Sequence, residues 1–186
     1  IVEGEPVRVD TLRIEGLDAV PERSAIIAGL PTRVGGWFDR YANAEARDSL
    51  TRRLRDNGYP DAETFLGYDL RAADKRATVV FTVSTGARRR IGEVRITQEG
   101  RDGRAPEVRQ RAVRRLAGLD VGDLYRESAL ELAKRRLYQS EAFAQVVVEP
   151  AETVNDSLIT VDVNVREGYL RAARLGGGWG TLDCFR

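Results

Sequence analysis

The chain has 186 residues, of which 42% are hydrophobic and 32% are charged. This balance excludes an intrinsically disordered chain, because the apolar content is high enough to offset the entropy lost when the chain orders. Thirty basic residues against 29 acidic ones leave a net charge of +1, which argues against a polyanion-binding protein. No apolar run approaches the roughly 20 residues of a membrane-spanning helix.

Residues that carry enzyme chemistry are scarce. The sequence contains no histidine, so the commonest general base and most zinc sites are missing. Glu127 and Glu131 stand at helical spacing, but a pair on a solvated face lacks the pocket that shifts a pKa. The single Cys184 has no partner for an internal disulfide. We therefore expect no enzyme activity, no catalytic residue, no cofactor and no metal ion.

The first half of the chain predicts a strand, two helices and a hairpin. The strand covers 6–14, a short helix starts at Pro21, and Asp39 is a suitable N-cap for a longer helix. Asn57-Gly58 ends that helix, with Gly58 as a left-handed cap. Strands at 61–70 and 78–83 follow. Trp37 and Phe38 are expected in the core beneath the long helix.

The second half predicts the same order of elements. A strand at 91–97 precedes a helix that begins at Pro106-Glu107 and includes Val108. A second long helix carries Leu130, Ala133 and Leu137 and is about one turn shorter than its counterpart. Strands at 144–148 and 158–165 complete the unit.

Three glycines mark an internal repeat. Gly4, Gly86 and Gly168 each follow a strand-like segment, and both steps between them are 82 residues long (86 − 4 and 168 − 86). A constant step of this length indicates repeated small domains. The expected fold class is α+β, with two tandem β-α-α-β-β units. Each unit is a three-stranded mixed sheet with two helices on one face.

The order of elements, the helix end at Leu54-x-x-x-Gly58-Tyr59 and the strand ending Val-Arg-Glu-Gly168 resemble POTRA domains. These are the periplasmic repeats of the BamA/TamA family of outer-membrane assembly proteins. The resemblance implies the tail of a preceding POTRA at 1–4, POTRA domains at 5–86 and 87–168, and a truncated first barrel strand at 169–186. Glu141 departs from the family pattern, which has glycine there, so a different helix cap is expected.

The same resemblance implies a protein-binding scaffold on the periplasmic face of the bacterial outer membrane, with this fragment soluble. Its partners would be nascent outer-membrane proteins or secreted clients, a periplasmic or inner-membrane accessory protein, and the outer membrane through the missing barrel. Nucleic acid is not an expected partner.

Two strands are expected at sheet edges, because the hairpin places the second strand of each unit beside the third and leaves its other side unpaired. Such an edge accepts a partner strand by β-augmentation. The candidate binding residues are Glu63, Thr64, Phe65, Leu66 and Tyr68 in the first unit and Gln145, Val146, Val147 and Val148 in the second.

The junction between the units is short. Gly86 and Gly168 end their strands within about five residues of the next domain. We therefore expect each glycine to be a hinge that allows only a few relative orientations of the units. Arg88, Arg89 and Arg90 allow two interpretations: a solvated linker, or an electrostatic latch that fixes the angle between the units.

Two alternative functions stay open. The first is the POTRA region of a two-partner secretion transporter, which recruits one exported substrate. The second is an arginine-rich nucleic-acid-binding module, against which the near-zero net charge argues, because affinity for phosphates requires an excess of cations.

Overall fold

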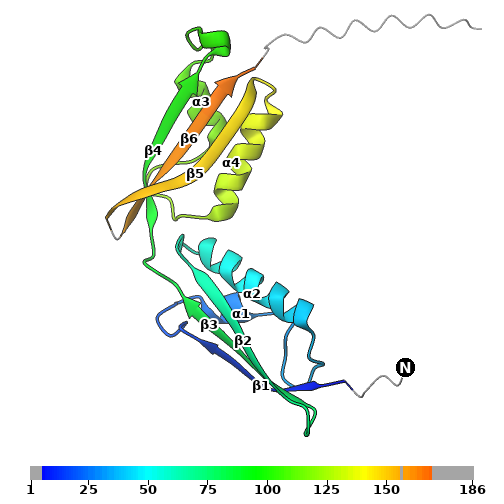
Figure 1. Cartoon of the computed structure of the whole chain (residues 1–186). Helices are drawn as coiled ribbons and strands as arrows, with labels where there is room; N and C mark the ends of the chain where they lie inside the picture. The colour runs from blue at the N-terminus through cyan, green and yellow to red at the C-terminus, as the bar shows by residue number, and fades with distance from the viewer. Residues whose placement is uncertain (1–5, 156, 169–186) are drawn as a thin grey trace, which may run out of the picture.

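The computed structural model describes residues 6–155 and 157–168, which form two units of the same fold (Figure 1). The first contains β1 (Arg8–Glu15), α1 (Arg23–Ile27), α2 (Arg40–Arg55), β2 (Glu63–Arg71) and β3 (Arg76–Ser84). The second contains β4 (Arg90–Glu99), the 3-10 turn η1 (Arg101–Gly103), α3 (Gln110–Ala117), α4 (Glu127–Gln139), β5 (Phe143–Asn155) and β6 (Leu158–Glu167). The predicted segments at 1–4 and 169–186 lie outside the described residues.

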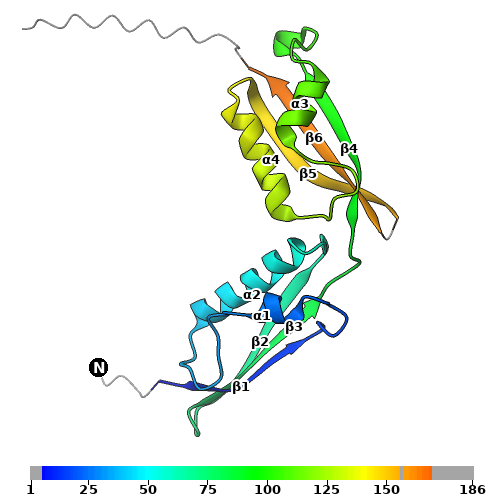
Figure 2. The ribbon, with the colours of Figure 1, turned by 180° about the vertical axis from the view of Figure 1, so that it is seen from behind.

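Each unit is a two-layer α+β structure. The strand orders are β1-β3-β2 and β4-β6-β5, so the last strand of each unit is the central one. It pairs in parallel with the first strand and antiparallel with the second. Seen from behind, the helices of each unit lie on one face of its sheet (Figure 2). The predicted fold class is confirmed.

Each unit has its own hydrophobic core between its helices and its sheet. Alternate residues of the central strand supply one side, as strand geometry requires: Val79 and Phe81 in β3, and Val161 and Val163 in β6, are fully buried. The long helices supply the other side through residues spaced three or four apart. These are Ala46, Leu50 and Leu54 in α2 and Leu130, Ala133 and Leu137 in α4.

Trp37 does not join the core, so that part of the prediction was wrong. Its backbone bridges to Arg8 at the outer side of β1, and the Arg8 guanidinium lies 3.9 Å from the ring centroid of Trp37. The Trp37 side chain is 57% exposed as a result. Phe38, one residue on, points the other way, packs against the core and meets the Tyr68 ring at 5.1 Å.

Two predicted element boundaries also change. Helix α3 begins at Gln110 and not at Pro106-Glu107, because the N–H groups of Glu107 and Val108 donate to the buried Glu167 carboxylate. Strand β5 continues past Val148 to Asn155 and includes Pro150, with register shifts on both sides of Thr153. An edge strand tolerates a proline because the missing N–H has no required partner there.

Both long helices are followed by a residue with positive φ at corresponding places. Gly58 has φ +97°, the predicted left-handed cap, and Glu141 has φ +55° in the corresponding place. The expectation of a different cap is confirmed by the hydrogen bonds. The Leu54 carbonyl accepts from the Tyr59 N–H at 3.2 Å, whereas the Leu137 carbonyl accepts from the Ser140 hydroxyl at 2.6 Å. The structure holds Glu141 in a conformation that costs an L-residue about 1–2 kcal/mol.

Replacing Glu141 with glycine is expected to stabilise the second unit by about 1 kcal/mol, since glycine adopts this conformation without steric cost. Chemical denaturation followed by amide exchange in α4 measures the change. Ser140→Gly is the matched control. Ser140 has φ −68° and its hydroxyl donates to the Leu137 carbonyl at 2.6 Å, so this variant should be less stable than wild type. A Glu141→Gly variant no more stable than wild type would contradict the argument.

Candidate protein-binding edges and the junction between the units

The first candidate edge is β2. It pairs with β3 without a register shift over its whole length, and no strand of the described part of the chain pairs with its other side. All five predicted binding residues of the first unit, Glu63 to Leu66 and Tyr68, lie on this strand. Phe65 is 58% exposed, and Tyr68 and Leu70 are also exposed although apolar. Strand β2 is therefore a regular, unpaired edge with apolar side chains in reach.

A groove of about 500 Å³ runs between this edge and α2. One wall carries Glu63, Thr64 and Phe65; the other consists mainly of polar side chains of α2, among them Arg52. Its ionic groups are largely paired, since Arg47 contacts Asp48 at 2.8 Å and Arg55 contacts Glu127 at 3.2 Å. The Thr64 hydroxyl is buried in this wall and has no hydrogen-bond partner among the described residues.

The second candidate edge, β5, is less regular. Gln145 to Val148 lie on it as predicted and pair with β6, which leaves the other side of β5 unpaired within the described residues. Register shifts interrupt the strand near Phe143 and beyond Pro150. Val146 points into the core, whereas Gln145 and Val147 line a hollow of about 270 Å³ on the sheet face that carries no helix. Bulges and proline are features that discourage strand addition.

The three arginines of the junction contact both units. Arg88 pairs with Glu22 at 2.9 Å and donates to the Asn57 carbonyl at 3.2 Å. The Arg89 side chain is only 11% exposed and pairs with Asp61 at 2.8 Å. Arg90 donates to the Gly122 carbonyl of the second unit at 2.8 Å. These contacts favour the latch over the solvated linker.

The backbone of Arg89 also joins the units. Its N–H donates to the Gly58 carbonyl at 2.7 Å, and its carbonyl accepts from the Tyr125 N–H at 3.1 Å. Tyr125 is buried beside this link, and burial, followed by the negative charge of Glu127, raises the pKa of its phenol to about 12. The phenol therefore stays neutral at physiological pH.

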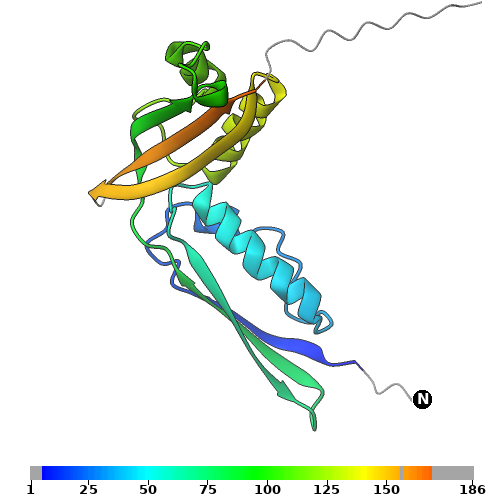
Figure 3. The ribbon, with the colours of Figure 1, turned by 45° about the horizontal axis from the view of Figure 1, so that its top comes forward.

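The C-terminal end of α2 meets the N-terminal end of α4 at this junction (Figure 3). The Asp56 carboxylate accepts from the Ser128 N–H at 2.8 Å, and Arg55 reaches Glu127. Arg126, the N-cap residue of α4, makes no side-chain cap, whereas Asp39 caps α2 with bonds to Tyr41 and Ala42. Asp56 therefore caps a helix of the neighbouring unit, where its negative charge is also favourable.

Sequence reasoning missed this contact. The one available signal was the arginine at position 126 where the first unit has the capping Asp39, which leaves the second long helix without a local cap. Which residue caps α4 in place of a local N-cap depends on how the two units pack, and no local sequence pattern encodes that packing.

Asp56→Ala is expected to remove about 1 kcal/mol of stability from the start of α4 and to loosen the junction, because a helix N-cap is lost. Faster amide exchange in residues 127–130 would report it. Adding Arg126→Asp should restore the exchange rates by supplying a local cap without restoring the link between units. Asp39→Ala, the matched control, should affect α2 instead. Unchanged exchange at the start of α4 in Asp56→Ala would contradict the capping role.

The two predicted hinge glycines differ. Gly86 has φ +66°, and a Cβ there would lie 3.0 Å from the Cβ of Asp61, the partner of Arg89. Gly168 does not adopt a left-handed backbone and donates its N–H to the Ala142 carbonyl. A glycine is thus required by backbone conformation at Gly86 but not at Gly168.

Within the described residues, no group of three or more histidine, cysteine, aspartate or glutamate side chains is arranged to hold a metal ion. No helix in that part of the chain is both long and apolar enough to cross a membrane. The features of this part of the chain that can bind a partner or fix the two units are the strand edges, the groove beside α2 and the hydrogen-bonded junction.

These features define a tandem repeat of two-layer units in which, within the described residues, the second strand of each unit has an unpaired outer edge. The model of the POTRA family, described as a surface antigen variable number repeat, matches residues 7–86 and 90–168. The chain therefore belongs to the POTRA family. Among curated proteins, none matches the sequence.

Solved structures with the same fold come from BamA and Omp85 proteins. The chain is 22% identical to POTRA3-5 of Haemophilus influenzae BamA, with a TM-score of 0.65, covering 89% of this chain and 63% of that one. It is 23% identical to Haemophilus ducreyi BamA lacking POTRA domains 1-3, with a TM-score of 0.71, covering 87% of this chain and 29% of the other. POTRA1-2 of Anabaena Omp85 is 16% identical, with a TM-score of 0.54 and coverages of 89% and 96%. The chain thus spans under two thirds of both BamA chains.

Proposed function

We propose that the chain is the periplasmic protein-binding part of an outer-membrane protein assembly or translocation factor, and that it binds extended client segments by strand addition to β2. The family match and the fold shared with BamA and with the periplasmic domain of Omp85 support the setting. The observation that carries the docking site is the unpaired, uninterrupted edge of β2 beside a groove.

Strand β2 is a better docking edge than β5 because its pairing with the neighbouring strand is regular. A docking strand needs several consecutive N–H and C=O groups in register, and β2 pairs evenly from Glu63 to Arg71. On β5, register shifts and Pro150 break the row of backbone groups. Moreover, Phe65 offers an exposed apolar contact beside the edge, while Val146 on β5 is buried.

The fitting ligand is an extended peptide with alternating side chains. Successive side chains of an added strand point to opposite faces, so one set would reach the groove beside α2 and the other the open face near Phe65. Strands of outer-membrane proteins have this alternation of apolar and polar residues. Backbone hydrogen bonds would then supply affinity with little dependence on the identity of the client.

The arginines do not favour the nucleic-acid alternative. Arg55 and Arg47 in the groove and Arg88 and Arg89 at the junction all face carboxylates. A phosphate backbone would have to displace these partners, which reduces the gain from counterion release.

A synthetic peptide of about ten residues, with valine or phenylalanine alternating with serine or lysine, tests the proposal. Amide shifts in an NMR titration should concentrate on β2 and on the facing side of α2. Two further peptides carry N-methyl groups on alternate residues, in one phase or in the other. Because strand N–H groups alternate in direction, strand addition predicts that one phase abolishes binding and the other leaves it.

Phe65→Glu should weaken the peptide several-fold without unfolding the first unit, because Phe65 is largely exposed. Val147→Glu on β5 is the matched control and should leave binding unchanged. Shifts that concentrate on β5, or equal binding of both N-methylated peptides, would show that strand addition to β2 is wrong.

A further inference from the structure

The loop that precedes the long helix is built in the same way in both units. In the first unit the N–H of Val9 donates to Gly36, the N–H of Gly35 donates to Val9, and Phe38 donates to Val7. In the second unit the matching bonds run from Ile91 to Asp123, from Gly122 to Ile91 and from Tyr125 to Arg89. Arg8 and Arg90 even donate to equivalent carbonyls, those of Gly35 and Gly122. Residues 34–41 therefore correspond one by one to 121–128.

In the second unit this loop is covered by the end of the preceding long helix. A Cβ on Gly58 would lie 2.6 Å from the Leu124 Cδ1, so Leu124 packs directly against the glycine that caps α2. Glu127 pairs with Arg55, and the Ser128 N–H donates to Asp56. The loop of one unit thus receives the helix end of another.

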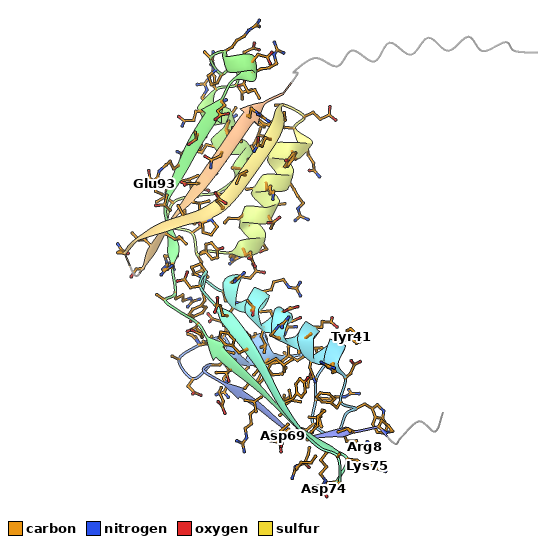
Figure 4. The ribbon with its side chains drawn as sticks, in the orientation of Figure 1. Arg8, Tyr41, Asp69, Asp74, Lys75 and Glu93 are labelled. Atoms are coloured by element: carbon orange, nitrogen blue, oxygen red, sulfur yellow. The ribbon has the colours of Figure 1, made fainter. Side chains whose placement is uncertain are left out.

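In the first unit, no segment of the described residues covers the corresponding surface. Trp37 takes the place of Leu124 and is 57% exposed, and Tyr41 takes that of Ser128 and is 88% exposed. Val34 is 61% exposed, as is its counterpart Val121 in the second unit, so Val34 does not distinguish the two loops. Figure 4 shows Tyr41 and Arg8 at the end of the first unit that faces away from the second. A cleft of about 630 Å³, lined by Val34, Trp37 and Arg8 among others, adjoins this surface. We call Trp37, Arg40 and Tyr41 the loop face.

We propose that the loop face receives the C-terminal end of the long helix of another POTRA unit joined N-terminally in the same chain. The occupant is indicated by the second unit, where the same hydrogen-bonded loop is filled in this way. Two exposed aromatic side chains at one place on a helix-loop turn are otherwise unfavourable in water.

The charges on the loop face specify what the incoming helix end should carry. In the second unit Glu127 pairs with Arg55 of the preceding helix. The first unit has Arg40 at the position of Glu127, so the docking helix should carry a carboxylate at the position of Arg55. Asp39 already caps α2 through Tyr41, so no capping carboxylate is required from the neighbour. Trp37 should cover the capping glycine of the incoming helix, as Leu124 covers Gly58.

A tandem fusion tests this with residues of the chain itself. A second copy of 5–86 is placed directly before Glu5, which keeps the natural step from glycine to Glu5-Pro6. Cys184→Ser removes the native thiol. The added copy carries Asp56→Cys, and the resident unit carries either Tyr41→Cys or Glu45→Cys. Glu45 is exposed and stands one helical turn further on. The pair Asp56→Cys with Ser128→Cys in the chain without the fusion is the positive control.

The rate of disulfide formation from position 41 should lie within about tenfold of the rate in the positive control. The rate from position 45 should be at least about tenfold slower than the control, because a disulfide requires Cα atoms within about 7 Å. Arg55→Glu in the added copy should raise the rate at position 41 by up to about fivefold, the effect expected of one exposed ion pair. Acrylamide quenching of Trp37, with every other tryptophan changed to phenylalanine, should fall several-fold in the fusion.

Equal rates at positions 41 and 45, or unchanged quenching of Trp37 in a fusion whose circular dichroism shows a folded added copy, would overturn the proposal. Cross-links that form mainly between molecules would also overturn it and assign the loop face to a contact between two copies of the chain. The proposed client site on β2 is not involved, so peptide binding measured on the same fusion tests that function separately.

Discussion

Glu167→Gln is expected to destabilise the second unit by about 3 kcal/mol, since the substitution removes a buried charge from donors that need it. Glu167 lies at the end of β6 and is 4% exposed. Its carboxylate accepts from the N–H of Val108 at 2.7 Å, from the N–H of Glu107 at 2.9 Å and from the Gln98 amide at 3.1 Å. A glutamine side chain would replace one accepting carboxylate oxygen with an NH2 group, which can only donate and would face these donors.

The same site should make the second unit sensitive to acid. Burial on its own would raise the pKa of Glu167, but the hydrogen bonds from Glu107, Val108 and Gln98 outweigh it and lower the pKa below its ordinary value of 4.5. A carboxyl whose pKa is lower in the folded state stabilises the fold above the unfolded pKa. That contribution is lost as the pH falls from about 4.5 through the lowered value.

Denaturation curves at several pH values, followed by amide exchange in β6, measure both effects. Glu99→Gln removes the same charge from an exposed residue of the neighbouring strand β4 and should change stability by less than about 0.5 kcal/mol. If Glu167→Gln behaves like Glu99→Gln, or keeps the full acid dependence of wild type, the carboxylate does not hold this loop.

Gly86→Val is expected to cost about 2–3 kcal/mol and to change the angle between the units. Gly86 has φ +66°, which a β-branched residue adopts only under strain. The new Cβ would also press on Asp61, which holds Arg89 across the junction at 2.8 Å. Solution scattering should therefore show a two-lobed particle of altered shape whose units stay folded.

Gly29→Val separates backbone strain from the effect on the junction. Gly29 also has φ +66°, but a side chain there would meet nothing within 4 Å. This control should lose similar stability while its scattering profile stays that of wild type. A profile unchanged by Gly86→Val, or one in which wild type already samples many distances between the units, would reduce Gly86 to an ordinary strand end.

Local patterns in the sequence determined the element order, the fold class and the edge strands. The alternation in β3 and β6 and the four-residue spacing in α2 each follow from a single element burying one face, which a short window of sequence records. The hairpins then placed β2 and β5 at the edges, because neighbouring strands joined by a short turn pair with each other. Asp39 and Gly58 were predictable for the same reason, since helix caps are local.

Only the tertiary structure decided what depends on contacts between distant segments. Trp37 is outside because β1 bonds to its loop, and α3 starts late because Glu167, some 60 residues on, binds the preceding N–H groups. The cap that Asp56 supplies to α4 requires two separately folded cores to meet, a long-range arrangement that no short stretch of sequence specifies.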